Sequence, residues 1–217
     1  MAIIERIAQR DSVGLRRLLA DGALNEQLAR AVSIELHTDG TGVYALQLYD
    51  IGSERSGLRG DDTGPADQIV EDELIATGVT SGLIRLAQHA RDRAGAGGNA
   101  VIRAVLTPAR TSSSLRIGHT RRHGMPESRS VSTQNEDMVA DAAAPLDGLA
   151  SPGPTTAATV AALIDELAQA FGIPELGQFS REGEVRWPYW RTGSQHHMVT
   201  WAHHNGIPVS AETLHLT

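Results

Sequence analysis

Asn99-Ala-Val-Ile-Arg-Ala-Val-Leu-Thr107 is the stretch that decides the fold, and Ser113-Ser-Leu-Arg-Ile-Gly-His-Thr120 follows it. The first run is rich in apolar and β-branched residues and is bounded by glycine and proline, as strands often are. In the second run Leu115 and Ile117 alternate with Arg116, which is typical of a half-buried strand. We therefore expect strands over 100–107 and 114–120 in the central sheet.

Positive charge is concentrated at the end of this predicted strand pair. Arg116, Arg121, Arg122 and His123 follow one another with almost no acidic residue among them. Arginine makes bidentate contacts with phosphate and carboxylate groups. We expect these four residues to form an Arg-rich hairpin rim that contacts an anion.

The alternative interpretation of this charge is a solvated surface without a ligand. The charged region also contains Arg103 and Arg129, and the chain has acidic stretches at 61–73 and 136–147. Charge runs are usually solvated faces, so these stretches are candidates to neutralise the arginines from within the chain.

Composition restricts both the fold and the chemistry. The chain has 217 residues, 41% of them hydrophobic, and a formal net charge of −7. This length supports one sizeable core, and the acidic balance argues against a general nucleic-acid coat protein. The sequence contains no cysteine and no lysine, which excludes disulfides, thiolate metal sites, Schiff-base chemistry and a P-loop lysine. Basic residues that are all arginine indicate a GC-rich, bacterial genome.

We expect a cytoplasmic protein without a membrane partner. The first residues lack a charged segment followed by an apolar one, so no secretory signal is predicted. No apolar run approaches the length that a membrane span requires. The absence of cysteine is compatible with a reducing cytosol.

The remaining apolar patterns predict one α+β domain over 1–217, with a mixed sheet packed by amphipathic helices. Apolar spacing predicts a strand over 43–49 and helices over 24–37, 81–93 and 156–171. Strand 43–49, helix 81–93 and strand 100–107 form a β-α-β succession, and if the strands are parallel neighbours the crossover is right-handed. The predicted core contains Leu28, Val32, Leu46, Leu48, Leu83, Leu86, Val101, Leu106, Ile117, Leu163, Ile164 and Leu167.

Two further segments are interpreted from their composition. Residues 135–154 are acidic and then rich in alanine, proline and glycine, which favours a surface loop. Residues 185–190 are interpreted as a strand. Residues 196–204 fit either a strand or a helix, and we choose the strand. Asn205-Gly206 is a strong hairpin signal, so we expect a C-terminal aromatic β-hairpin region with 207–210 as its edge strand.

The aromatic residues of this region are the second candidate binding surface. Trp187, Tyr189 and Trp190 lie between Arg186 and Arg191, and such a set can stack on a base, a sugar or a partner's side chain. The alternative is a small aromatic core that closes the C-terminal hairpin.

Four histidines, His196, His197, His203 and His204, are the candidate metal ligands. Neutral imidazole is a common metal ligand. However, neither a strand nor a helix brings His197 close enough to His203 or His204 to hold one ion without help from a neighbouring element. The alternative is a group of surface histidines.

These patterns support two functional hypotheses from different classes. The first is a non-catalytic binding or regulatory module that recognises a protein or an anionic ligand, nucleic acid included, through the Arg-rich rim and the aromatic surface; it needs no cofactor. The second is a hydrolase that uses histidine and carboxylate residues, with a metal ion as the candidate cofactor. Convergence of several histidines with carboxylates in one pocket favours the hydrolase, whereas dispersed histidines together with a flat aromatic-arginine surface favour the binding module.

Overall fold

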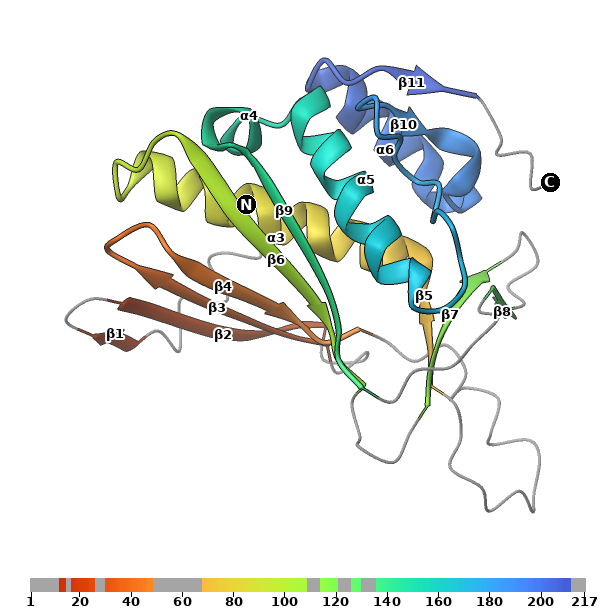
Figure 1. Ribbon diagram of the computed structural model, residues 1–217, viewed down its shortest axis with the longest axis horizontal. Helices are drawn as coiled ribbons and strands as arrows, with labels where there is room; N and C mark the ends of the chain where they lie inside the picture. The colour runs from red at the N-terminus through yellow and green to blue at the C-terminus, as the bar shows by residue number, and fades with distance from the viewer. Residues whose placement is uncertain are drawn as a thin grey trace.

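A long helix, α3 (Asp72–Asp92), lies at the centre of an α+β fold and is covered by strands on one side and helices on the other (Figure 1). The computed structural model describes residues 12–14, 17–25, 30–48, 68–108, 114–120, 126–129 and 136–211. The α+β class predicted from the sequence is confirmed. In place of one mixed sheet, however, the described strands form four small sheets, three of which contribute residues to one shared core.

The first sheet is an antiparallel meander in the order β1 (Ser12–Gly14), β2 (Arg17–Asn25), β3 (Arg30–His37) and β4 (Gly42–Leu46). The predicted strand at 43–49 is confirmed, although it is shorter than expected.

The predicted helix over 24–37 is wrong, because its described residues, 24–25 and 30–37, belong to β2 and β3. Val32, Ile34 and Leu36 repeat every second residue, as in a strand. Val32 and Leu36 also lie four residues apart, as on one face of a helix. In β3, Val32 pairs with Leu46 of β4, and cross-strand pairs between such residues stabilise a sheet. Val32 is buried as predicted, and Leu28 lies outside the described residues.

Helix α3 follows directly on β5 (Gln68–Glu71) and continues through Gly78 and Gly82 without a break. The predicted helix over 81–93 is therefore confirmed as the second half of a longer one. The glycines face β4: a Cβ atom on Gly82 would lie 2.7 Å from Cδ1 of Tyr44, and one on Gly78 would lie 3.2 Å from Cδ2 of Leu46. Glycine here allows the first sheet to approach the helix.

The strand predicted at 100–107 is confirmed as β6 (Asn99–Leu106). Its partner is β9 (Met138–Pro145), which pairs antiparallel with β6 along all eight residues. The prediction of a surface loop over 135–154 is therefore wrong. Alanine alternates with other residues along β9, and small inward side chains allow the strand to lie against α5 (Pro154–Gln169). The loop-like composition conceals a strand of low intrinsic β propensity.

Helix α4 (Leu146–Ala150) occupies the rest of the segment predicted as a loop, and Leu146, Leu149 and Ala150 are buried. Val101 of β6 was expected in the core but is 86% exposed. The inward side of β6 is taken by its even-numbered residues, Ala100, Ile102, Ala104 and Leu106.

A third sheet places β7 (Leu115–Thr120) between β5, with which it pairs in parallel, and β8 (Pro126–Ser128), with which it pairs antiparallel. The strand predicted at 114–120 is confirmed, and its Ile117 is fully buried. The helix predicted at 156–171 is confirmed as α5, and its Leu163, Ile164 and Leu167 are buried in the shared core.

The C-terminal region is not the predicted hairpin. Residues 185–190 divide into β10 (Val185–Arg186) and a 3₁₀ helix, η3 (Trp187–Tyr189), and the residues predicted as a strand at 196–204 belong to α6 (Thr192–His204). A final strand, β11 (Val209–Ser210), pairs in parallel with β10.

The Asn-Gly signal ends a helix instead of forming a hairpin turn. Gly206 has a φ of 64°, and the N–H of Ile207 donates to the carbonyl of Ala202 at 2.9 Å. This is how glycine commonly closes a helix C-terminus. Among the described helices, none combines the length and apolar character needed to cross a membrane.

Replacing Gly82 with Ala should lower the free energy of unfolding by about 1–3 kcal/mol, because the new methyl group would clash with Tyr44. The matched control is Gly193→Ala in α6, where no atom lies within 4 Å of the added Cβ, and a gain of about 0.5 kcal/mol is expected. Urea unfolding of both variants measures the difference. Equal gains in the two variants would show that β4 does not press on Gly82.

Candidate functional site: an apolar cleft between two strand edges

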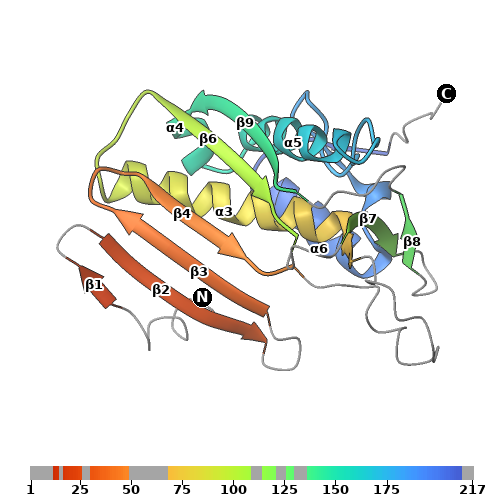
Figure 2. The ribbon, with the colours of Figure 1, turned by 60° about the horizontal axis from the view of Figure 1, so that its bottom comes forward.

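A cleft of about 870 Å³ lies between β4 and β6. The two strands run in the same direction, with α3 visible between them (Figure 2). Residues of α3 form the floor of the cleft. The predicted β-α-β succession therefore exists as an order along the chain, but its strands are not hydrogen-bonded neighbours. The cleft occupies the gap that separates them.

The cleft is lined mainly by apolar side chains from three elements. Tyr44 and Leu46 come from β4, Leu83 and Leu86 from α3, and Ile102 from β6. Its deepest part reaches Leu149, Leu163 and Leu167. A large, mostly apolar concavity with few polar groups is the usual form of a binding site.

Three of the predicted core residues show why this cleft is unusual. Leu46, Leu48 and Leu86 have core-like positions in the sequence, yet they remain only half-buried because they face the cleft. Apolar surface that stays in contact with water gains free energy when a ligand covers it, at about 25 cal/mol per Å². The sequence predicted that these residues make apolar contacts, but it did not show that they line a cleft instead of the core.

Both long sides of the cleft are strand edges. Among the described strands, β4 pairs only with β3 and β6 pairs only with β9, so one edge of each faces the cleft. Edge strands present backbone N–H and C=O groups without strand partners. The eight residues of β6 give an edge about 26 Å long at the usual rise per residue.

Polar residues lie both near the ends of the cleft and along its sides, where Tyr44 of β4 and Arg103 of β6 belong to the lining. Gln68 and Asn99 lie near the ends, with Asp39 in the turn before β4. Burial raises the pKa of Tyr44 above its ordinary value of 10.0, so its hydroxyl remains protonated and able to donate a hydrogen bond near neutral pH. This lining can therefore bind a ligand through hydrogen bonds and apolar contacts.

A second polar feature, the acidic junction, consists of Glu71, Asp72 and Glu73 where β5 meets α3. None of the three is more than 4% exposed. Buried carboxylates require ion pairs and hydrogen bonds to offset their loss of hydration. The partners come from segments far away in the sequence.

Arg129 and Arg191 provide the compensating charge. Nη1 of Arg129 donates to Asp72 at 2.7 Å and also to the carbonyl of Leu176 at 3.0 Å. Arg191 donates its backbone N–H to Glu73 at 3.0 Å, and its Nη1 lies 3.3 Å from Glu71. The junction thus attaches the end of the third sheet and the start of α6 to the N-terminus of α3.

His119 completes the junction, with its Nδ1 lying 3.2 Å from both carboxylate oxygens of Asp72. This hydrogen bond raises the pKa of His119 above its ordinary value of 6.5, against the opposing effect of burial. A protonated His119 adds a third positive charge to three buried negative ones. We interpret the acidic junction as a structural set of ion pairs and hydrogen bonds that holds these elements together.

Sequence reasoning did not identify the acidic junction as a buried cluster, because acidic residues at a helix start are usually solvated and favoured there by the helix dipole. The available signal was its position directly after the apolar residues Ile69 and Val70 of β5. The interpretation of internally neutralised arginines holds for two of them. Arg129 pairs with Asp72, and Arg103 pairs with Asp141 at 2.8 Å.

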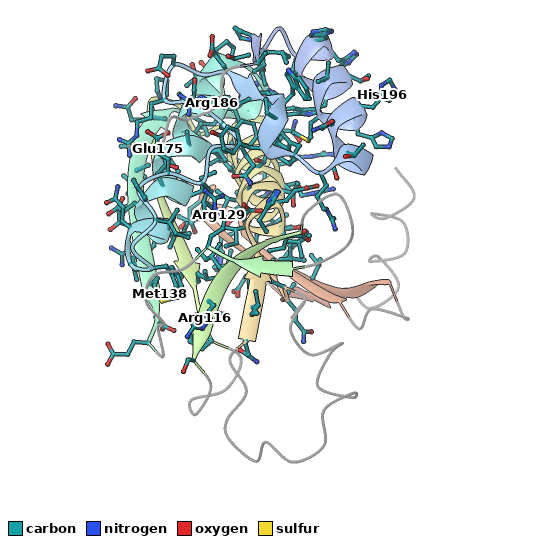
Figure 3. The ribbon with its side chains drawn as sticks, turned by 90° about the vertical axis from the view of Figure 1, so that its right-hand side faces the viewer. Arg116, Arg129, Met138, Glu175, Arg186 and His196 are labelled. Carbon is teal, nitrogen blue, oxygen red and sulfur yellow. The ribbon has the colours of Figure 1, made fainter. Side chains whose placement is uncertain are left out.

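The residues predicted for the Arg-rich rim are only partly described. Arg116 is half-buried on β7, whereas Arg121, Arg122 and His123 lie outside the described residues. Arg116 is well separated from Arg186 (Figure 3). The predicted rim and the predicted C-terminal surface therefore do not form one patch through these two residues.

The predicted aromatic surface is largely internal. Trp190 is only 2% exposed and packs edge-on against Phe179, with ring centroids 5.6 Å apart. Arg186 pairs with Glu175 at 3.0 Å, and Arg191 belongs to the acidic junction. Trp187 is exposed and Tyr189 is half-buried. The aromatic-core interpretation is confirmed for Trp190, since burial of a large ring stabilises the fold more than surface contact would.

The candidate metal ligands are dispersed. His196, His197, His203 and His204 are all exposed on α6, and His196 points away from the body of the molecule (Figure 3). Within the part of the chain that the structure describes, no group of three or more histidine or carboxylate side chains is arranged to hold a metal ion. The dispersal meets one part of the condition set out for a binding module, and the flat aromatic-arginine surface that forms the other part is not present, because Trp190 is buried.

Protonation of His119 should stabilise the fold at acidic pH. Because the folded pKa is raised, the contribution is complete below about pH 6.5 and is lost as the pH rises through the folded pKa. We expect His119→Gln to cost about 1 kcal/mol near pH 6 and much less near pH 9. Urea unfolding across this range tests the difference.

Two comparisons control this measurement. Burial raises the pKa of Asp165 to about 6, but that contribution is common to wild type and variant and cancels in their difference. His203→Gln, at an exposed position of α6, should leave the pH profile unchanged. A cost of His119→Gln that is the same at every pH would contradict the assigned interaction with Asp72.

The chain was compared with protein-family models, with curated proteins and with solved structures. No family model matches it, and neither curated proteins nor solved structures provide a match. The candidate site therefore rests on the geometry of this chain.

Proposed function

We propose that the protein is a non-catalytic binding module that receives an extended, apolar polypeptide segment in the cleft between β4 and β6. The observation that carries this proposal is the combination of an apolar floor with an unpaired strand edge on each long side. A polypeptide strand satisfies both features, because its backbone pairs with an edge and its alternate side chains cover the floor.

The length of the cleft favours a polypeptide over a compact small molecule. Its lining includes residues from both ends of β4 and of β6, so it follows the strands along their whole length. A compact ligand would cover part of the floor and leave the remaining backbone groups to water. A strand of comparable length covers the whole floor and gains main-chain hydrogen bonds throughout.

Other parts of the sequence-based hypothesis remain proposals. Recognition of an anion by Arg116 and the neighbouring arginines stays a prediction, since three of the four residues lie outside the described part of the chain. A cytoplasmic location and a bacterial source also stay predictions. A histidine-carboxylate hydrolase is the weaker hypothesis, because the exposed histidines of α6 are not gathered around a pocket.

The proposal is tested with a fluorescent ten-residue peptide of alternating valine and threonine, followed by fluorescence anisotropy. Wild-type protein should bind it, and Leu86→Asp should weaken binding by about tenfold or more, since it places a charge in the apolar cleft. Thr200→Asp is the matched control, because it adds the same charge at an exposed position of α6. Circular dichroism confirms that both variants are folded.

A second peptide tests the strand pairing itself. N-methylation of alternate backbone amides removes donors without reducing apolar surface, so we expect this peptide to bind about tenfold more weakly or worse. Equal affinity for both peptides would contradict pairing with a strand edge. Failure of wild-type protein to bind the unmodified peptide, or binding unaffected by Leu86→Asp, would overturn the proposed site.

A further inference from the structure

The outward side of the β6–β9 ribbon carries eight exposed residues in four cross-strand pairs, and the pair at one end is Asn99 opposite Pro145. The other three pairs follow it along the ribbon. In the pairing register, Val101 is opposite Ala143, Arg103 is opposite Asp141, and Val105 is opposite Val139. All six are exposed, and Val101, Val105 and Val139 are 86%, 50% and 46% exposed. We call this set the outer face; it points away from the core, which the alternate residues of the same strands contact.

The composition of the outer face differs from that of an ordinary solvated sheet face. A sheet with one side in water usually carries polar residues on that side. Here four of the six positions are valine or alanine, and the two charged residues form one ion pair, with Nε of Arg103 2.8 Å from Asp141. Contiguous exposed apolar residues of this kind mark interaction surfaces.

The charge arrangement identifies what kind of surface would fit. Consider a second copy of the face placed on the first by a two-fold axis parallel to the strands. Each Arg103 then lies over the other copy's Asp141, and each Val105 lies over the other copy's Val139, because the axis exchanges β6 with β9 at constant height. A two-fold axis perpendicular to the strands, in the plane of the interface, would instead stack Arg103 on Arg103.

We infer that the outer face is an isologous dimer interface, formed with a second copy of this chain about a two-fold axis parallel to β6 and β9. The Arg103–Asp141 pairs of the two copies then form a ring of four alternating charges. The valine and alanine side chains of both copies surround this ring. Face-to-face packing of this kind is the usual way in which two sheets bury a shared apolar layer. The inference goes beyond the proposed function, because it concerns a second copy of this chain. Val101, Arg103 and Val105 also belong to the lining of the cleft, so the dimer interface borders the cleft.

The predicted interface is small, since each copy contributes only two strands. Interfaces below the standard size are generally weak, so we expect a dissociation constant on the order of 10–100 micromolar. In sedimentation equilibrium, the weight-average mass of the wild type should rise from 23.1 kDa toward twice that value as the concentration increases.

Two charge variants distinguish contact between chains from contact within one chain. Arg103→Asp gives a face with two negative charges, and Asp141→Arg gives a face with two positive charges. Each variant alone should dimerise at least about tenfold more weakly than wild type, because like charges then meet across the interface. An equimolar mixture should recover association to within about threefold of wild type, since opposite faces now meet.

Two controls keep the result specific. The exchanged pair is exposed, so each variant should keep a thermal unfolding midpoint within a few degrees of wild type. Val101→Ser changes no charge at a position that is 86% exposed; it should weaken dimerisation and should not be rescued by mixing with either charge variant.

Three results would overturn the inference. The first is a wild-type mass of 23.1 kDa at every concentration up to several hundred micromolar. The second is a charge variant that dimerises as strongly as wild type, which would place the contact elsewhere, for example at a strand edge. The third is a mixture of the two charge variants that associates no better than either one alone.

Discussion

The described structure depends on the packing of separate small sheets against one central helix, α3. Gly78 and Gly82 carry no side chains where Tyr44 and Leu46 of β4 approach α3, so the first sheet lies close to the helix. The β6–β9 ribbon is held by contacts with α5 as well as α3. Because each sheet has its own support, neither needs a hydrogen bond to the other. The cleft is the space that this arrangement leaves open.

The N-terminus of the same helix carries the acidic junction. Glycines near the middle of α3 admit β4, and buried carboxylates at its start hold Arg129, Arg191 and His119. A buried ion pair that loses one partner is strongly destabilising, because the remaining charge stays dehydrated. An arrangement that separates these partners leaves buried carboxylates unpaired and is less stable. The junction therefore favours the observed arrangement of the third sheet and the C-terminal region.

The two candidate interaction surfaces differ in what they offer a partner. The cleft presents unpaired backbone groups and a concave apolar floor, which fit an extended chain of varied sequence. The outer face presents side chains only, and its Arg103–Asp141 pair makes it complementary to itself. Both depend on β6, which has one edge on the cleft and one side in solvent. A single strand can support both because its backbone edge and its side-chain face point in perpendicular directions.

What the sequence alone determined was the class of the fold and most elements whose apolar period is unambiguous. The strands at 100–107 and 114–120 and the helix at 156–171 have one dominant pattern each, and all three are present. Residues 24–37 fit both periods, and the pairing of Val32 with Leu46 resolved the ambiguity only in three dimensions. Asn205-Gly206 is equally compatible with a hairpin turn and with a helix end.

Only the tertiary structure decided the candidate sites. The sequence marked Leu46, Leu48 and Leu86 as apolar, but an apolar side chain has the same pattern whether it meets the core or lines a cleft. It marked Trp190 and Arg191 as a binding surface, whereas Trp190 is buried against Phe179 and the partly exposed Arg191 is bonded to Glu73. Burial, pairing and exposure are properties of residues that meet across the fold. Local periodicity carries no information about which distant segments meet, and for this reason the cleft, the acidic junction and the outer face emerged from the coordinates alone.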